Sequence, residues 1–261
     1  MPERMGRGTT PDRARRASPG EIDVPLCFLK ALRARGPVSN AEAEVILGLA
    51  RDQVDYENGR DIVVEGTTPT HSCLMISGCS ARYTVLSDGR RQITAIHVAG
   101  DFVDLHSLFL RPMDHSVMAI GGARIARVPH PVLHGLIETQ PNLTRLLWTM
   151  TVIDAAIFRQ WLVSSGRQNA DSQVARFLCE MYARLALVDR TDGLSFDLPV
   201  TQSLLGDAMG MSTVQANRSV QVLRQAGLIR WKGAQVTILD WEGLVARGEF
   251  DPTYLNIRGM S

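Results

Sequence analysis

The segment 198–229 constrains the fold of this chain more than any other, because it combines two short amphipathic helices with a glycine between them. The first helix is predicted over residues 202–209, and Gly210 supplies the permissive backbone of the turn. Ser212 then opens an S-x-x-Q capping box, and Gly227 stands where a helix C-terminus favours a left-handed residue. This layout is typical of a helix-turn-helix whose second helix enters the DNA major groove.

The predicted second helix has an apolar and a polar face. Ala216, Val220 and Leu223 recur at i, i+4 and i+7 and form a stripe that faces the interior. On the polar face, an Arg side chain suits guanine and an Asn side chain suits adenine. The residues predicted to contact DNA from this helix are Ser212, Thr213, Val214, Asn217, Arg218 and Gln221.

A basic hairpin is predicted directly after this helix, over residues 228–239, with Lys232 and Gly233 in its turn. Such a hairpin is a wing, and we expect Arg230 and Lys232 to contact phosphates. Between residues 199 and 239 the chain has four Arg or Lys residues and a single Asp, which is the electrostatic pattern of a DNA-binding module. A surface helix pair in another α-rich domain is the alternative.

The segment resembles the C-terminal domain of the Crp/Fnr family, the bacterial regulators typified by the cyclic-AMP receptor protein and the fumarate-nitrate regulator. The pattern L-P-x-T-Q, G-x-S, N-R and L-R-x-x-G-L-I is carried by Leu198, Pro199, Thr201, Gln202, Gly210, Ser212, Asn217, Arg218, Leu223, Arg224, Gly227, Leu228 and Ile229. Gly206 stands where the family usually has Ala, and Ala216 where it usually has Val. Both departures are expected to loosen the packing of the motif.

The resemblance implies an α+β fold with three parts. These are an N-terminal antiparallel β-roll similar to cyclic nucleotide-binding domains, a long dimerisation helix and a C-terminal winged helix-turn-helix. It also implies a cytoplasmic homodimer that binds double-stranded DNA at a palindromic operator and contacts RNA polymerase. The expected division is a disordered basic tail over 1–20, a β-roll domain with flanking helices over 21–140, the dimerisation helix over 141–165 and the DNA-binding domain over 166–261.

Short apolar runs separated by glycine turns predict the strands of the roll, with turns at Ser77–Gly78 and Gly121–Gly122. After the roll, apolar residues at helical spacing continue to about Ser164. By the resemblance, the dimer interface is predicted to comprise Leu143, Leu147, Met150, Ile153, Ile157 and Trp161. A face packed on its own domain is the alternative.

A hinge is predicted at residues 165–167, followed by a helix over residues 170–188 in which Asp171 and Glu180 are expected to be solvated. No apolar run approaches the ~18–20 residues that a membrane span needs, so no membrane is expected as a partner.

One comparison with the family bears on whether cyclic AMP is the effector. Relatives that bind cyclic AMP carry a Glu shortly after a G-D-F turn and an Arg-Ser or Arg-Thr pair about ten residues later. Aligned on the turn at residues 100–102, these positions hold Leu105 and His115–Ser116. Neither Leu nor His replaces a permanently charged bidentate guanidinium, so cyclic AMP is not the expected effector. An anion bound by His115 and Arg111 remains open, and the effector-pocket candidates are Leu105, Arg111, His115 and Ser116.

Cysteine and histidine chemistry leave two sensing alternatives within the same family. Iron–sulfur relatives hold several closely spaced N-terminal Cys, whereas this chain has Cys27 there and three scattered others, so a cluster is not expected. A single reactive thiol at Cys179 is the redox alternative. Three histidines recur every nine residues at 97, 106 and 115, which leaves haem or metal open, but no metal ligand and no cofactor is predicted.

An enzyme is not expected. The chain lacks a P-loop, a dinucleotide fingerprint and the G-x-S-x-G and H-E-x-x-H motifs. A ligand-binding signalling module that does not bind DNA is the alternative from another class.

Overall fold

The computed structural model describes residues 15–16 and 26–257. Of the predicted basic tail, only the two-residue strand β1 is described, and it pairs with β2; the rest lies outside the described residues. The N-terminal half contains β1 (Arg15–Arg16), α1 (Leu26–Arg33), α2 (Asn40–Gly48), β2 (Gln53–Tyr56), β3 (Asp61–Val63), β4 (His71–Val85), β5 (Arg91–Val98), the 3-10 helix η1 (Leu105–Leu108), β6 (Ser116–Pro129) and α3 (His130–Thr139).

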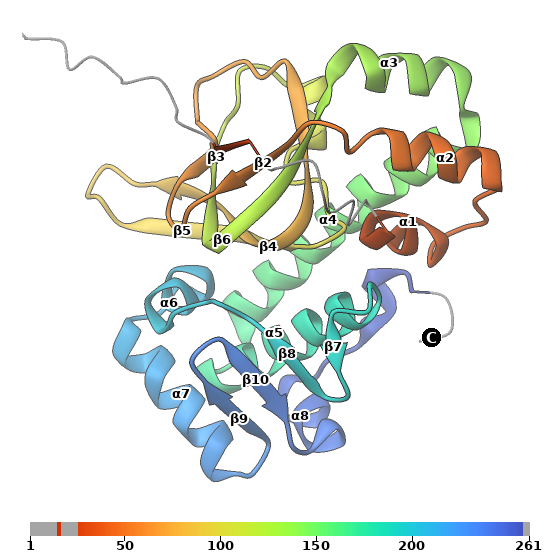
Figure 1. Ribbon diagram of the computed structural model, residues 1–261. Helices are drawn as coiled ribbons and strands as arrows, with labels where there is room; N and C mark the ends of the chain where they lie inside the picture. The colour runs from red at the N-terminus through yellow and green to blue at the C-terminus, as the bar shows by residue number, and fades with distance from the viewer. Residues whose placement is uncertain (1–14, 17–25, 258–261) are drawn as a thin grey trace, which may run out of the picture.

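The strands form an antiparallel six-stranded sheet in the order β1-β2-β6-β4-β5, with β3 also paired to β6. The sheet curls into the predicted β-roll, and α1, α2 and α3 gather at one end of it (Figure 1).

The turns predicted at Ser77–Gly78 and Gly121–Gly122 are wrong, because both pairs lie inside the long strands β4 and β6. Gly78 pairs with Ala123 whereas the next residue pairs with Ile120, so two glycines bulge out of β6 opposite Gly78. A Cβ atom on Gly78 would collide with the Gly122 carbonyl. The glycines therefore mark a bulge, where backbone meets backbone, and not the end of a strand.

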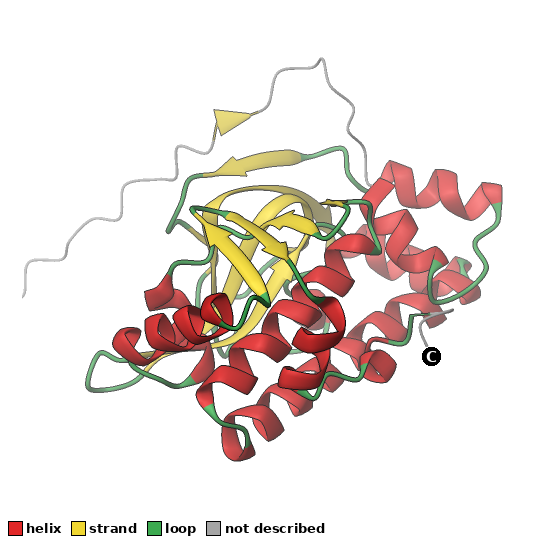
Figure 2. Cartoon of the chain, turned by 90° about the horizontal axis from the view of Figure 1, so that it is seen from below, coloured by secondary structure: helices red, strands yellow, loops and turns green. Residues whose placement is uncertain are grey.

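The long helix α4 (Pro141–Arg167) connects the two halves of the molecule, and it runs beneath the roll (Figures 1 and 2). The hinge predicted at residues 165–167 is wrong, because these residues are helical. The break falls at Gln168 and Asn169, where the Asn169 side chain accepts a hydrogen bond from the Ser172 amide at 2.9 Å and starts the next helix. By length and composition alone α4 could cross a membrane, which the sequence prediction missed; its inner face packs in the cores of both halves.

The C-terminal half contains α5 (Ala170–Ala186), β7 (Thr191–Asp192), β8 (Ser195–Asp197), α6 (Gln202–Met209), α7 (Thr213–Gln225), β9 (Ile229–Lys232), β10 (Gln235–Ile238), α8 (Trp241–Gly248) and the 3-10 helix η2 (Pro252–Leu255). Its sheet has the order β7-β8-β10-β9. One apolar cluster joins this half to the roll, because Ile93 and Ile120 of the roll belong to the same core as Leu205 of α6. The two halves are therefore packed together.

Candidate nucleic-acid interface

The two helices of the predicted helix-turn-helix begin and end where local sequence signals place them. Thr201 caps α6 by accepting a hydrogen bond from the Leu204 amide at 3.2 Å, and Gly210 ends it in the left-handed conformation. Ser212 then caps α7 by accepting from the Gln215 amide at 3.2 Å. These caps satisfy amides at the two helix starts and fix the turn between α6 and α7.

Gly206 does not loosen the motif as expected. A Cβ atom at this position would lie 2.7 Å from the carbonyl oxygen of Met211. The Met211 amide also donates to the Gly206 carbonyl at 3.0 Å, so the turn lies directly on α6. In this chain the glycine makes room for a close backbone approach.

Helix α7 has one buried face and one exposed face. Ala216, Val220 and Leu223 are buried, as predicted. The six side chains predicted to contact bases are all exposed, and Val214 is 80% exposed. An apolar side chain so far in water, flanked by exposed polar residues, is suited to contact a thymine methyl group.

The wing also forms as predicted. In β9 the side chains of Ile229 and Trp231 point inward while those of Arg230 and Lys232 are exposed. The Trp231 indole Nε1 donates to the carbonyl oxygen of Gly233 at 3.1 Å and ties the turn to the strand. The two exposed cations therefore stand on a fixed hairpin beside α7. The sequence did not predict β8, which pairs with β10 and extends the wing into a larger sheet.

A groove between the first turns of α5 and α7 adds residues that the sequence analysis missed. It is lined by Asn169, Ala170, Asp171, Ser212, Val214, Gln215, Arg218, Ser219 and Val222. Backbone amides at helix N-termini carry partial positive charge. The sequence signal that could have revealed this groove is Asn169, because a polar residue directly before a helix marks an N-cap.

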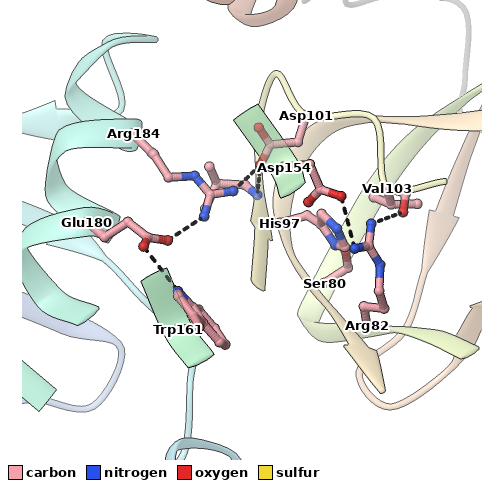
Figure 3. A network of polar contacts seen from close by, with 10 residues as sticks. Ser80, Arg82, His97, Asp101, Val103, Asp154, Trp161, Glu180 and Arg184 are labelled. Atoms are coloured by element: carbon pink, nitrogen blue, oxygen red, sulfur yellow. Dashed lines mark hydrogen bonds and ion pairs between the residues drawn. The ribbon is translucent and has the colours of Figure 1, made fainter. Parts of the chain in front are cut away.

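Glu180 was expected to be solvated, and this prediction is wrong. Its side chain is 1% exposed and accepts a hydrogen bond from Trp161 Nε1 at 3.1 Å (Figure 3). It also accepts one from the Tyr254 hydroxyl at 2.9 Å. Arg184 Nη1 donates to it at 3.0 Å. Burial, followed by the adjacent Glu180 charge and hydrogen bond, raises the pKa of Tyr254. The carboxylate joins α4, α5 and the C-terminal segment.

Arg184 extends this network to the roll. Its Nη2 atom donates to Asp101 at 2.6 Å, in the turn after β5 (Figure 3). Burial alone would lower the pKa of Arg184, but Asp101 and Glu180 outweigh that effect and hold it above its usual value. A second link joins Arg91 of β5 to Asp207 of α6 at 2.6 Å. These two ion pairs, together with that of Lys30 and Asp189, connect the N-terminal half of the molecule to the DNA-binding half.

A cavity lies between the roll, α4 and Arg184. Its lining comprises Arg35, Arg82, His97, Asp101, Phe102, Leu105, His106, Met150, Thr151, Ile153, Asp154, Ile157, Arg184 and Leu255. The Arg82 guanidinium is already engaged, because it donates to Asp154 at 3.0 Å and to the Val103 carbonyl oxygen at 3.1 Å (Figure 3).

The predicted effector pocket is not assembled. Of its four candidates only Leu105 lines the cavity. Arg111 is exposed and Nη2 contacts His130 Nδ1 at 3.1 Å, whereas Ser116 accepts a hydrogen bond from the backbone amide of Glu65 at 3.0 Å. These partners lie on other elements, which the alignment on the G-D-F turn could not indicate.

His115 lies beside His106, with 5.0 Å between the ring centroids. Burial is the largest cause that lowers the pKa of both rings, to about 4 for His106, so the His106 ring is neutral at pH 7.

The residues predicted for the dimer interface face the cores of their own protomer. Four of them, Leu143, Leu147, Ile153 and Ile157, are buried in the cores of their own protomer, and Met150 and Trp161 are half-buried against the same cores. The apolar side chains that α4 exposes are Trp148, Val152, Phe158, Leu162 and Val163, with Trp148 at 74% and Leu162 at 65%. The stripe at helical spacing was the face packed on its own domains.

The four cysteines are buried and divided among three separate core clusters. Burial raises the pKa of the Cys179 thiol to about 12, and it does the same for Cys79. This is the opposite of the lowered pKa that activates a thiol, so the redox alternative at Cys179 loses its chemical basis.

Comparisons with known proteins agree with this architecture. Residues 53–140 match the family model of the cyclic nucleotide-binding domain, and residues 172–247 match that of the Crp-like helix-turn-helix domain. The chain is 28% identical over 174 residues to a probable transcriptional activator of Rhizobium leguminosarum bv. viciae, covering 67% of this chain and 71% of the relative. It is 26% identical over 215 residues to the nitrogen fixation regulation protein FixK of Bradyrhizobium diazoefficiens, covering 82% and 89% of the two chains.

Among solved structures, that of FixK2 from Bradyrhizobium japonicum matches with a TM-score of 0.66 at 25% identity, covering 74% of this chain and 95% of that one. The two domain matches, their order along the chain and the exposed recognition face of α7 all point to one group of proteins. This chain belongs to the Crp/Fnr family of DNA-binding transcription regulators.

Proposed function

We propose that this protein regulates transcription as a cytoplasmic homodimer whose two α7 helices read a palindromic operator, without cyclic AMP. The observation that carries the proposal is the division of α7 into a buried apolar face and an exposed face that bears Val214, Asn217 and Arg218. Polar and cationic groups of these types are suited to read base edges in the major groove. The exposed cations of the wing supply phosphate contacts beside them.

The exposed apolar face of α4 supports the homodimer. Trp148, Val152 and Leu162 lie at i, i+4 and i+14, which places them along one side of a helix. Covering apolar surface contributes about 25 cal/mol per Å². A second copy of the same helix would cover this stripe and present two recognition helices with two-fold symmetry. In this proposal a protein partner, and not a bilayer, covers the exposed apolar side chains of α4.

Independence from cyclic AMP is supported by the residues around the cavity. Leu105 offers no acceptor for a ribose hydroxyl, and the guanidinium of Arg82 is occupied by Asp154. A cyclic phosphate would have to break that pair. We further propose that the dimer contacts RNA polymerase, in keeping with the similarity to a probable transcriptional activator.

The test is selection from a random duplex library with untagged protein at fixed, near-physiological salt, with and without cyclic AMP. We expect the same palindrome in both arms, with half-sites about 10 bp apart from centre to centre or a multiple of that spacing. Enrichment only in the cyclic AMP arm would contradict the proposed independence. Salt-sensitive binding without any enriched sequence in either arm would contradict the proposed reading of bases by α7.

A further inference from the structure

Two histidines and an aspartate meet at the edge of the roll. His106 comes from η1, and Asp114 and His115 immediately precede β6. One potential ligand atom from each of the three residues lies within 4.8 Å of the other two. The imidazole rings are 5.0 Å apart and inclined at 48°. The fold thus brings together three potential metal-binding side chains, of which His106 and Asp114 lie eight positions apart in the sequence.

Both rings carry a nitrogen that lacks a partner. Nε2 of His106 and Nε2 of His115 are buried, and neither has a hydrogen-bond partner among the described residues. The side chain of His115 is only 9% exposed. Because buried polar atoms in native proteins are nearly always paired, two unpaired nitrogens in adjacent rings are candidates for binding a common partner.

Asp114 contacts one ring of the cluster and is itself open to solvent. Its carboxylate lies 2.7 Å from Nδ1 of His115, which fixes that ring. The Asp114 side chain is 83% exposed, so the cluster can be reached from solvent. The contact with Asp114 engages Nδ1 of His115 and leaves Nε2 as the ring nitrogen without a partner among the described residues.

We propose that His106, Asp114 and His115 bind one divalent first-row transition-metal ion per chain. Neutral imidazole and carboxylate ligands suit Zn²⁺ and its neighbours in the first row, and three protein ligands leave a position for water. With metal–nitrogen bonds of about 2.0–2.1 Å, tetrahedral ligand atoms are about 3.3 Å apart, so the three side chains must draw together on binding. Asp114 must also exchange its hydrogen bond to Nδ1 of His115 for the metal. The site is separate from the four cysteines, which lie in the apolar cores.

One of the other histidines provides the control. His97 also has an orphaned Nε2, but it lies outside the three-residue cluster, and its Nδ1 is paired with Ser80 at 3.2 Å. His134 is exposed on α3, where its ring contacts Phe109. We therefore use His134→Asn as the matched variant for His106→Asn and His115→Asn.

The experiment uses untagged full-length protein freed of metal with a chelator and then titrated with Zn²⁺ against a chromophoric competitor. We expect one Zn²⁺ per chain in the wild type and in His134→Asn, and an affinity at least tenfold lower in His106→Asn and in His115→Asn. Circular dichroism of each metal-free variant shows whether it is folded. Co²⁺ substitution should give visible ligand-field bands without a thiolate charge-transfer band.

A second measurement uses the wild-type protein alone, so it does not depend on the folding of any variant. Long-range proton–nitrogen correlation spectra of the wild type report each imidazole nitrogen directly. We expect Zn²⁺ to shift the ring nitrogens of His106 and His115 and to leave those of His134 in place. The proposal is overturned if the wild type binds no Zn²⁺, if binding is unchanged in both cluster variants, or if the shifted nitrogens belong to other histidines.

Discussion

Replacing Arg184 by Met tests whether the buried network holds the two halves of the protein together. The guanidinium donates to Glu180 at 3.0 Å and to Asp101 at 2.6 Å, and its side chain is 8% exposed. Methionine fills a similar volume but leaves the Glu180 carboxylate buried without a cation. Removing one member of a buried ion pair costs about 3–5 kcal/mol of unfolding free energy.

We expect the lower end of that range, about 3 kcal/mol. Glu180 keeps its hydrogen bonds from Trp161 and Tyr254, and Asp101 keeps one from the Val98 amide at 2.8 Å. Because a neutral amide in place of Glu180 removes the stranded charge, the double variant Glu180→Gln/Arg184→Met should recover about 1–3 kcal/mol relative to the sum of the single changes.

Urea unfolding monitored by tryptophan fluorescence measures these differences. Arg230→Met is the control, since its exposed side chain should alter the free energy of unfolding by no more than about 0.5 kcal/mol. The reasoning is refuted if Arg184→Met lies within about 1 kcal/mol of the wild type. It is equally refuted if the double variant shows no recovery.

Three further predictions concern the wing, the dimer and the thiols. Replacing Arg230 or Lys232 by Ala should reduce the steepness with which the DNA association constant falls with salt, by about one in the log–log slope per lost phosphate contact. Anisotropy titrations on any duplex measure this slope, and an unchanged slope would show that the residue does not contact phosphate. Leu162→Glu should convert the dimer into a monomer in light scattering, because it places a charge on the exposed apolar face of α4, and a persistent dimer would place the interface elsewhere. Burial raises the pKa values of Cys79 and Cys179 to about 12, and the reactive thiolate forms only as the pH approaches these values. Both thiols should therefore react with a thiol reagent at pH 8 about three orders of magnitude more slowly than free cysteine. A fast thiol phase that is lost on replacing either residue would contradict this.

The recognition element could be predicted from the sequence because its signals are local. Ser212 caps α7 through a residue three positions away, and Gly210 ends α6 by its own backbone conformation. The burial of Val220 follows from helical spacing on a single helix. None of these features depends on distant parts of the chain.

The errors arise where distant segments decide the outcome. Glu180 looks like a surface charge on its helix, but Tyr254 comes from 74 positions away to donate to it. The α4 residues predicted for the dimer interface are buried, because helical spacing identifies an apolar stripe without telling what covers it. Part of that stripe packs in the same core as Ile93 of the roll. Likewise, the two glycines of β6 form a bulge because they lie opposite Gly78 of β4, a pairing that no local signal reveals.

The most direct test of the central claim compares wild type and Arg218→Ala on the selected duplex and on a shuffled duplex, at one salt concentration. The wild type should prefer the selected duplex by at least about 10³-fold. Arg218→Ala should lose about 1–3 kcal/mol, or about 5- to 150-fold, on the selected duplex and far less on the shuffled one. Equal losses on both duplexes would make Arg218 a phosphate contact and contradict base reading by α7.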